Sequence, residues 1–275
     1  MNCPRKSFES KIFAAIFFAM LTLALILAKP AEAAPAKHAA ATPSQPQQAA
    51  AADSDKTLAA MQDELDRSRQ RLVLKIPDKS EPARPYYIQY RILDLDVRTI
   101  VAEFGALISS TTGRNRIMSV DVRVGNYNLD SSNFITDEGF SGFLGSTGTV
   151  GIDRDYDSLR QDLWLATDQA FKAAVENFSK KQAFVSRLAN APSIPDLSPA
   201  APTVAVEPLR EPDWTTRNWE QEAKAVSAAL RAFPQLHSSR VTYRLIYTTS
   251  YLLNSEGTKI RANRSLAAIE ASLET

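Results

Sequence analysis

The chain has 275 residues, with 32 Lys and Arg against 31 Asp and Glu, so its formal net charge at pH 7 is +1. A balance this even creates no positive field that would attract nucleic acid, and a nucleic-acid partner is not expected. One cysteine and two histidines exclude a disulfide framework and leave few ligands for zinc.

Residues 1–33 have the pattern of a secretory signal peptide. Arg5, Lys6 and Lys11 precede an apolar run over residues 12–28, and a small-x-small cleavage site follows at residues 31–33. We therefore predict export to the periplasm or the extracellular space. The apolar run is at the lower limit of what spans a bilayer, so an uncleaved inner-membrane anchor is the alternative.

The leader and the segment after it leave one domain. Cys3 lies in the leader, so the mature chain is expected to have no cysteine. Residues 34–55 are mostly Ala, Pro, Gln, Lys and Ser, and with no apolar face to bury they are predicted to form a disordered tether. Residues 56–275 remain as a single domain, long enough to bury a sizeable core.

The first half of this domain is predicted to begin with a helix and continue as a sheet. Apolar residues at near-helical spacing predict an amphipathic helix over 56–72. Three strands follow, at 86–93, 99–109 and 116–125, with turn residues at 112–115. The last strand alternates apolar with polar residues, which indicates a sheet with one buried and one solvent-facing side. The short links favour an antiparallel meander.

A glycine-spaced stretch comes next. Five of the nine glycines occupy every third position of residues 139–151. The run lacks the prolines of collagen and does not match a phosphate-binding loop. Two interpretations remain open, a surface loop and a flap over a peptide groove.

Three alternating aspartates, Asp153, Asp155 and Asp157, suggest a calcium site at first sight. The spacing does not fit an EF-hand, because Ser158 and Trp164 occupy the places of its glycine and its last carboxylate. We expect the aspartates to complement the positive end of a helix predicted over residues 158–178.

The second half is predicted to repeat the mixture of helix and strand. Residues 189–214 contain six prolines and form a linker or an ordered excursion across the surface. A helix follows over 219–233, and then strands at 239–249, 251–254 and 258–270, with a turn at 255–257. The predicted fold class is α+β, with a mixed, mostly antiparallel sheet formed by two strand meanders and packed against long helices.

No catalytic, cofactor-binding or metal-binding residue is predicted in this chain. His38 lies in the tether and His237 follows a predicted helix end. The chain contains no His-Glu-x-x-His motif and no Gly-x-Ser-x-Gly elbow, and no spacing singles out a pair of carboxylates.

Several segments together carry a family resemblance. They are residues 86–91 (Tyr-Tyr-Ile-Gln-Tyr-Arg), 104–107 (Phe-Gly-Ala-Leu), 120–125 (Val-Asp-Val-Arg-Val-Gly), 133–134 (Asn-Phe), the helical region 156–187, and 251–261 with its Asn-Ser-Glu-Gly-Thr core. In this order they resemble the N-terminal part of the TldD/PmbA family of zinc metallopeptidases. The resemblance extends from Leu58 to the end of the chain.

The resemblance has implications for function. In that family the zinc site, a His-Glu-x-x-x-His helix with a distant cysteine, belongs to the part that follows this domain, so zinc is expected only there. The chain then resembles an exported, non-catalytic front half that acts in assembly or peptide admission. Its expected partners are a TldD/PmbA-like catalytic half, in a homo- or hetero-oligomer, and a peptide substrate.

Two questions stay open at this level. The alternative function is a stand-alone envelope binding or interaction module without a proteolytic role, and the sequence leaves open whether the chain is part of an enzyme. A front half should also leave an apolar surface or strand edge uncovered, and residues 258–270, the last predicted strand, are the expected edge.

Overall fold

The computed structural model describes residues 55–76, 80–136, 139–141, 146–152, 155–188 and 194–275. The predicted leader lies outside these ranges, as does the predicted tether up to residue 54. Within the described ranges, no helix combines the length and the hydropathy that crossing a membrane requires.

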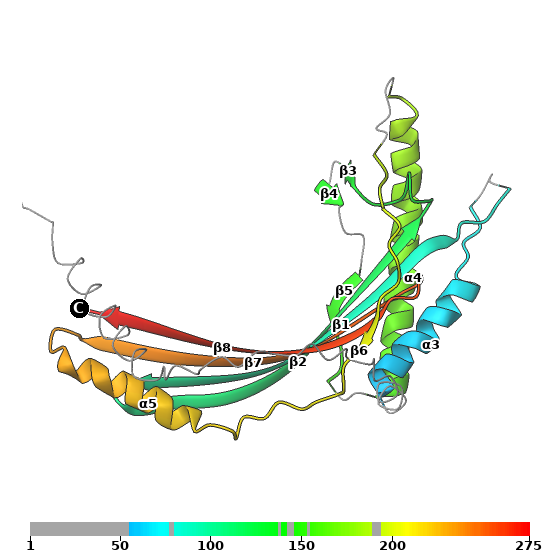
Figure 1. Ribbon diagram of the computed structural model, residues 1–275. Helices are drawn as coiled ribbons and strands as arrows, with labels where there is room; N and C mark the ends of the chain where they lie inside the picture. Colours follow the sequence, from blue (N-terminus) through cyan, green and yellow to red (C-terminus); the bar gives the residue numbers. More distant parts are fainter. Residues whose placement is uncertain (1–54, 77–79, 137–138, 142–145, 153–154, 189–193) are drawn as a thin grey trace, which may run out of the picture. The chain divides into compact units, whose positions relative to one another are not determined.

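A six-stranded sheet in the order β5-β2-β1-β7-β8-β6 organises the domain (Figure 1). Its strands are β1 (Pro85–Glu103), β2 (Ala106–Val124), β5 (Ser146–Thr149), β6 (Val204–Val206), β7 (Ser238–Asn254) and β8 (Lys259–Glu274). All neighbours are antiparallel except β6 and β8, which are parallel. A separate pair joins β3 (Phe134–Thr136) to β4 (Gly139–Ser141). The predicted α+β class with a mixed, mostly antiparallel sheet is confirmed.

The first meander contains two long strands where three were predicted. β1 and β2 have 19 residues each and are joined by Phe104 and Gly105. These two residues have φ values of 42° and 83°, the left-handed conformation that a tight two-residue hairpin requires. The turn therefore lies inside the predicted strand 99–109. The predicted turn at 112–115 is wrong, because these residues pair with β1 inside β2.

The second meander also joins two predicted strands into one. Ser250, which was expected to separate them, pairs with Leu93 of β1 and Ala262 of β8 inside β7. The predicted turn at 255–257 is confirmed. The Asn254 side chain accepts hydrogen bonds from the backbone N–H of Glu256 at 3.1 Å and of Thr258 at 2.9 Å, and so shapes the turn.

Three α-helices lie in the described part of the chain, two of them beginning at the predicted residue and α4 beginning two residues before it. They are α3 (Lys56–Arg71), α4 (Tyr156–Val185) and α5 (Trp219–Ala229), the last followed by the short 3-10 helix η1 (Leu230–Ala232). Asp55 caps the first turn of α3, and Asp155 accepts from the backbone N–H of Ser158 in α4. The expected role of the aspartates is thus confirmed at Asp155, whereas Asp153 lies outside the described residues.

The helices pack against one face of the sheet. β1 and β7 bury alternate residues, and paired residues share a face. α3 and α4 cover this face where β1 begins, in a core that includes Ile88, Tyr90 and Leu253. α5 covers the same face near the hairpin between β1 and β2, over Ile100 and Tyr243.

Candidate functional site

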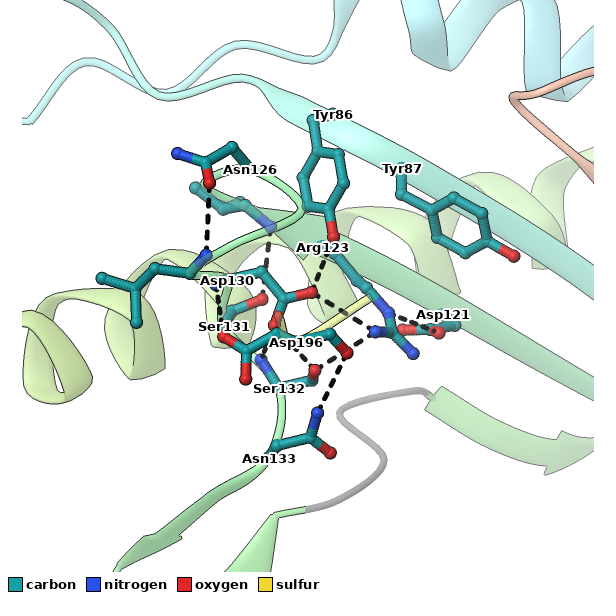
Figure 2. Close-up of polar contacts among 12 residues, drawn as sticks. Tyr86, Tyr87, Asp121, Arg123, Asn126, Asp130, Ser131, Ser132, Asn133 and Asp196 are labelled. Atoms are coloured by element: carbon teal, nitrogen blue, oxygen red, sulfur yellow. Dashed lines mark hydrogen bonds and ion pairs between the residues drawn. The ribbon is translucent and has the colours of Figure 1, made fainter. Parts of the chain in front are cut away.

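A polar network of the described residues lies beside the end of β2 (Figure 2). We call it the Asp130 cluster, and its members are Tyr86, Asp121, Arg123, Asp130, Ser132, Lys181 and Asp196. They come from β1, β2, the loop 125–133, α4 and the segment before β6. The cluster therefore joins parts of the chain that are far apart in sequence.

Asp130 is at the centre of the cluster and has no solvent-exposed surface. Its carboxylate accepts from the Tyr86 hydroxyl at 2.7 Å and from Arg123 Nη1 at 3.3 Å, and from both the backbone N–H and the hydroxyl of Ser132 at 2.7 Å each. Burial acts to raise the pKa of Asp130, but the bonds from Ser132 and Tyr86 and the charge of Arg123 outweigh it and lower that pKa.

Neighbouring groups respond to the same environment. Burial, and then the hydrogen bond to Asp130, raises the pKa of the Tyr86 hydroxyl, so this group stays protonated as a donor. Burial also raises the pKa of Asp121, although Arg123 opposes the shift with an ion pair of 3.1 Å. The Arg123 guanidinium lies 5.6 Å from the centre of the Tyr87 ring, a distance suited to a cation–π contact.

Lys181 ties this network to α4. It is 6% exposed, and its Nζ donates to the Ser132 carbonyl and to Asp196 Oδ2, both at 2.6 Å. Asp196 also accepts from the backbone N–H of Asp130 at 2.8 Å. A buried lysine is stable only when it is paired in this way. The cluster therefore fixes the loop 125–133 against both α4 and the segment before β6.

A second set of charges lies within the helix-covered face, and we call it the sheet ion pairs. Arg116 forms a two-pronged contact with Asp94 at 2.6 and 2.7 Å, and their side chains are 3% and 9% exposed. Arg261 has no exposed surface, contacts Asp55 through Nη1, and donates from Nε to the Glu207 carbonyl at 2.6 Å. These pairs connect β1 to β2, and β8 to the start of α3.

The sequence did not reveal either group. The side of β2 that carries Asp121 and Arg123 was expected to face solvent, and this expectation is wrong here, because Asp121 is 6% exposed. One signal was available, since Asp94 and Asp96 alternate in phase with Ile92. That phase places two carboxylates on the buried face of β1, where Arg116 and Arg114 meet them.

The arrangement holds backbone segments in place. In the Asp130 cluster each carboxylate accepts from donors of the same chain, and each cation lies beside a carboxylate. Within the described residues, no group of three or more His, Cys, Asp and Glu is arranged to hold a metal ion. His237 donates its backbone N–H to the Glu274 carbonyl at 2.9 Å, whereas His38 lies outside the described ranges. The glycine-spaced stretch supplies β4 and β5, and its interpretation as a flap stays a prediction.

No protein-family model matches the chain, and no curated protein matches it. Among solved structures it is similar to TldE from Thermococcus kodakarensis, with 11% identity and a TM-score of 0.42, over 78% of this chain and 39% of that one. It is also similar to two structures described as "putative modulator" of DNA gyrase. The one from Thermotoga maritima has 10% identity and a TM-score of 0.39, over 78% of this chain and 38% of that one. The one from Bacteroides thetaiotaomicron has 10% identity and a TM-score of 0.43, over 80% of this chain and 41% of that one.

The chain thus spans about two fifths of the length of each of these structures. The likeness is therefore partial.

Proposed function

We propose that the chain is the exported, non-catalytic front half of a TldD/PmbA-like protein. In this role it acts in assembly, or in admitting peptide, together with a TldD/PmbA-like catalytic half. The observation that carries the proposal is the internal pairing of the buried charges, which ties the strands of the sheet to each other and to the helices.

The pairing supports a positioning role. Breaking a buried pair leaves an uncompensated charge, so such pairs hold their backbone segments firmly in place. The sheet ion pairs fix the centre of the sheet to the start of α3, and the Asp130 cluster fixes the end of β2 to α4. A domain that places a second chain around a distant active site needs this stiffness.

The remaining support comes from the sequence. The ordered segments that resemble TldD/PmbA proteins extend through most of residues 56–275, and in that family zinc belongs to the part that follows. The predicted leader implies that assembly takes place in the envelope. Peptide is then a ligand of the complete assembly.

Affinity capture from the cell envelope tests the proposal. The chain is given a C-terminal tag and expressed in its own cells, and co-purifying chains are identified by mass spectrometry. The expected result is a chain with a His-Glu-x-x-x-His helix, and zinc-dependent peptide hydrolysis by the captured complex. An unrelated exported protein with the same leader and tag is the control.

The alternative function is a stand-alone envelope binding module. One observation favours it, because the sheet face opposite the helices carries partly exposed aliphatic side chains, among them Leu93, Leu95 and Val97 of β1. Capture of the tagged chain with no zinc-site partner, and with no zinc-dependent hydrolysis, would overturn the front-half proposal and favour this module.

A further inference from the structure

The last strand of the sheet has a largely unpaired outer edge. β6 pairs with β8 only at residues 259–261, and the Glu207 side chain accepts from the Asn263 backbone N–H at 2.7 Å. β7 pairs with the inner edge of β8 along its whole length, but beyond Asn263 no described strand lies along the outer edge, and residues 264–275 are all exposed. An edge of this length is a template for another strand.

The hydrogen bonds already present show which residues point outward. Lys259 N–H donates to Thr203, the Arg261 carbonyl accepts from Glu207, and Asn263 N–H donates to Glu207, all on the side away from β7. The Glu274 carbonyl instead accepts from His237, on the β7 side. The backbone N–H and C=O groups of successive residues in a strand point to opposite edges, so the odd-numbered residues from 265 to 273 present these groups on the outer edge of β8.

This set of outward groups is symmetric about Ile269. An antiparallel copy of the same edge would pair residue 265 with 273, 267 with 271, and Ile269 with itself, so all five residues would form hydrogen-bonded pairs. The same register places Arg264 of each copy opposite Glu274 of the other. A shift of the centre to Ala267 would bring in Arg261 and Asn263, whose outward groups are already bound.

Apolar side chains strengthen this register. Ile269 is 60% exposed and Leu273 is 38% exposed. They pair with Tyr243 and Ser239 of β7, so they lie on the sheet face that α5 covers further along. Two-fold pairing would place the two Ile269 side chains directly beside each other and withdraw them from water.

From this edge we infer that two copies of the chain associate through β8, in an antiparallel two-fold pair centred on Ile269 that makes one continuous sheet. The partner is a second copy, because the free groups, the opposite charges and the apolar side chains all complement themselves in one register. The inference does not rest on the proposed function, since every residue in it belongs to this chain's own edge.

Cysteine crosslinking tests both the partner and the register. Ile269→Cys would place two thiols on residues whose Cα atoms lie about 5.5 Å apart, within the reach of a disulfide. Leu266→Cys is the matched control, because Leu266 is also 60% exposed. In the proposed register its two copies are about 20 Å apart, six residues along the strand. The unsubstituted chain controls for Cys3.

After mild oxidation of the purified exported chain, Ile269→Cys alone is expected to form a covalent dimer. Efficient crosslinking of both variants, of Leu266→Cys alone, or of neither would overturn the inference. A charge-reversal set gives an independent readout by sedimentation equilibrium. Arg264→Glu should weaken the dimer several-fold, and adding Glu274→Arg should restore it. Failure of restoration, a strictly monomeric parent chain at tens of micromolar, or polymers that grow with concentration would each contradict two-fold pairing.

Discussion

Removal of the Asp94 carboxylate should destabilise the fold far more than removal of an exposed one. The Arg116 side chain is only 3% exposed in the native fold. In Asp94→Ala it keeps its charge but loses both short contacts to Asp94. Breaking one side of a buried ion pair costs about 3–5 kcal/mol. The matched control is Asp168→Ala, which breaks an ion pair of 2.7 Å with Lys172, 61% exposed, where about 0–1 kcal/mol is expected.

Urea unfolding followed by circular dichroism measures both costs, and an unchanged slope confirms that only stability has changed. Because a domain is stable by about 5–15 kcal/mol in total, the Asp94→Ala midpoint should fall by a large fraction of its value. Replacing both partners, Asp94→Leu with Arg116→Leu, should recover much of the loss, since it leaves no unpaired charge. A cost for Asp94→Ala no greater than that for Asp168→Ala would show that the buried ion pair of Asp94 and Arg116 does not stabilise the fold.

Four further outcomes are expected. The pKa of Asp130 is lowered in the fold, so its carboxylate adds to the free energy of unfolding above its unfolded pKa, and this stabilisation is lost as pH falls through the folded pKa. Asp130→Asn should therefore flatten the acid side of a plot of Tm against pH. An unchanged acid side would contradict this expectation. Gly125→Ala should lower the free energy of unfolding by about 2 kcal/mol or more, because φ is +113° and the new Cβ would lie 2.4 Å from a backbone oxygen. Gly113→Ala, whose new Cβ would have nothing within 4 Å, should change it by no more than about 1 kcal/mol. Urea unfolding measures both. N-terminal sequencing of the exported chain should begin near Ala34, and retention of Met1 would contradict export. Metal analysis after dialysis should find weak zinc binding at most, and one tightly bound zinc per chain would overturn the non-catalytic assignment.

Elements with a strong local signal could be predicted from the sequence. The helix expected over 56–72 is α3, because its apolar spacing and the cap at Asp55 point to the same structure. The turn at 255–257 was also predictable, since Asn254 and Gly257 supply its side-chain acceptor and its positive φ of 101°.

The errors have a physical cause in long-range pairing. The strand that begins at residue 86 was expected to end at Leu93, but β1 continues to Glu103. Asp94 and Asp96 are unfavourable in strands, and Arg116 and Arg114 of the neighbouring strand compensate for them. Gly113 was taken as part of a turn, although its pairing with Val97 keeps it extended. The Asp130 cluster was equally hidden, because Lys181 contacts Ser132 across 49 residues of sequence and Asp196 contacts Asp130 across 66.

Native mass spectrometry of the complex captured from the envelope tests the front-half function. The expected assembly contains this chain, a second chain with a His-Glu-x-x-x-His helix, and bound zinc that stays with the second chain when the assembly is dissociated. An assembly made only of copies of this chain, without zinc, would contradict the front-half function.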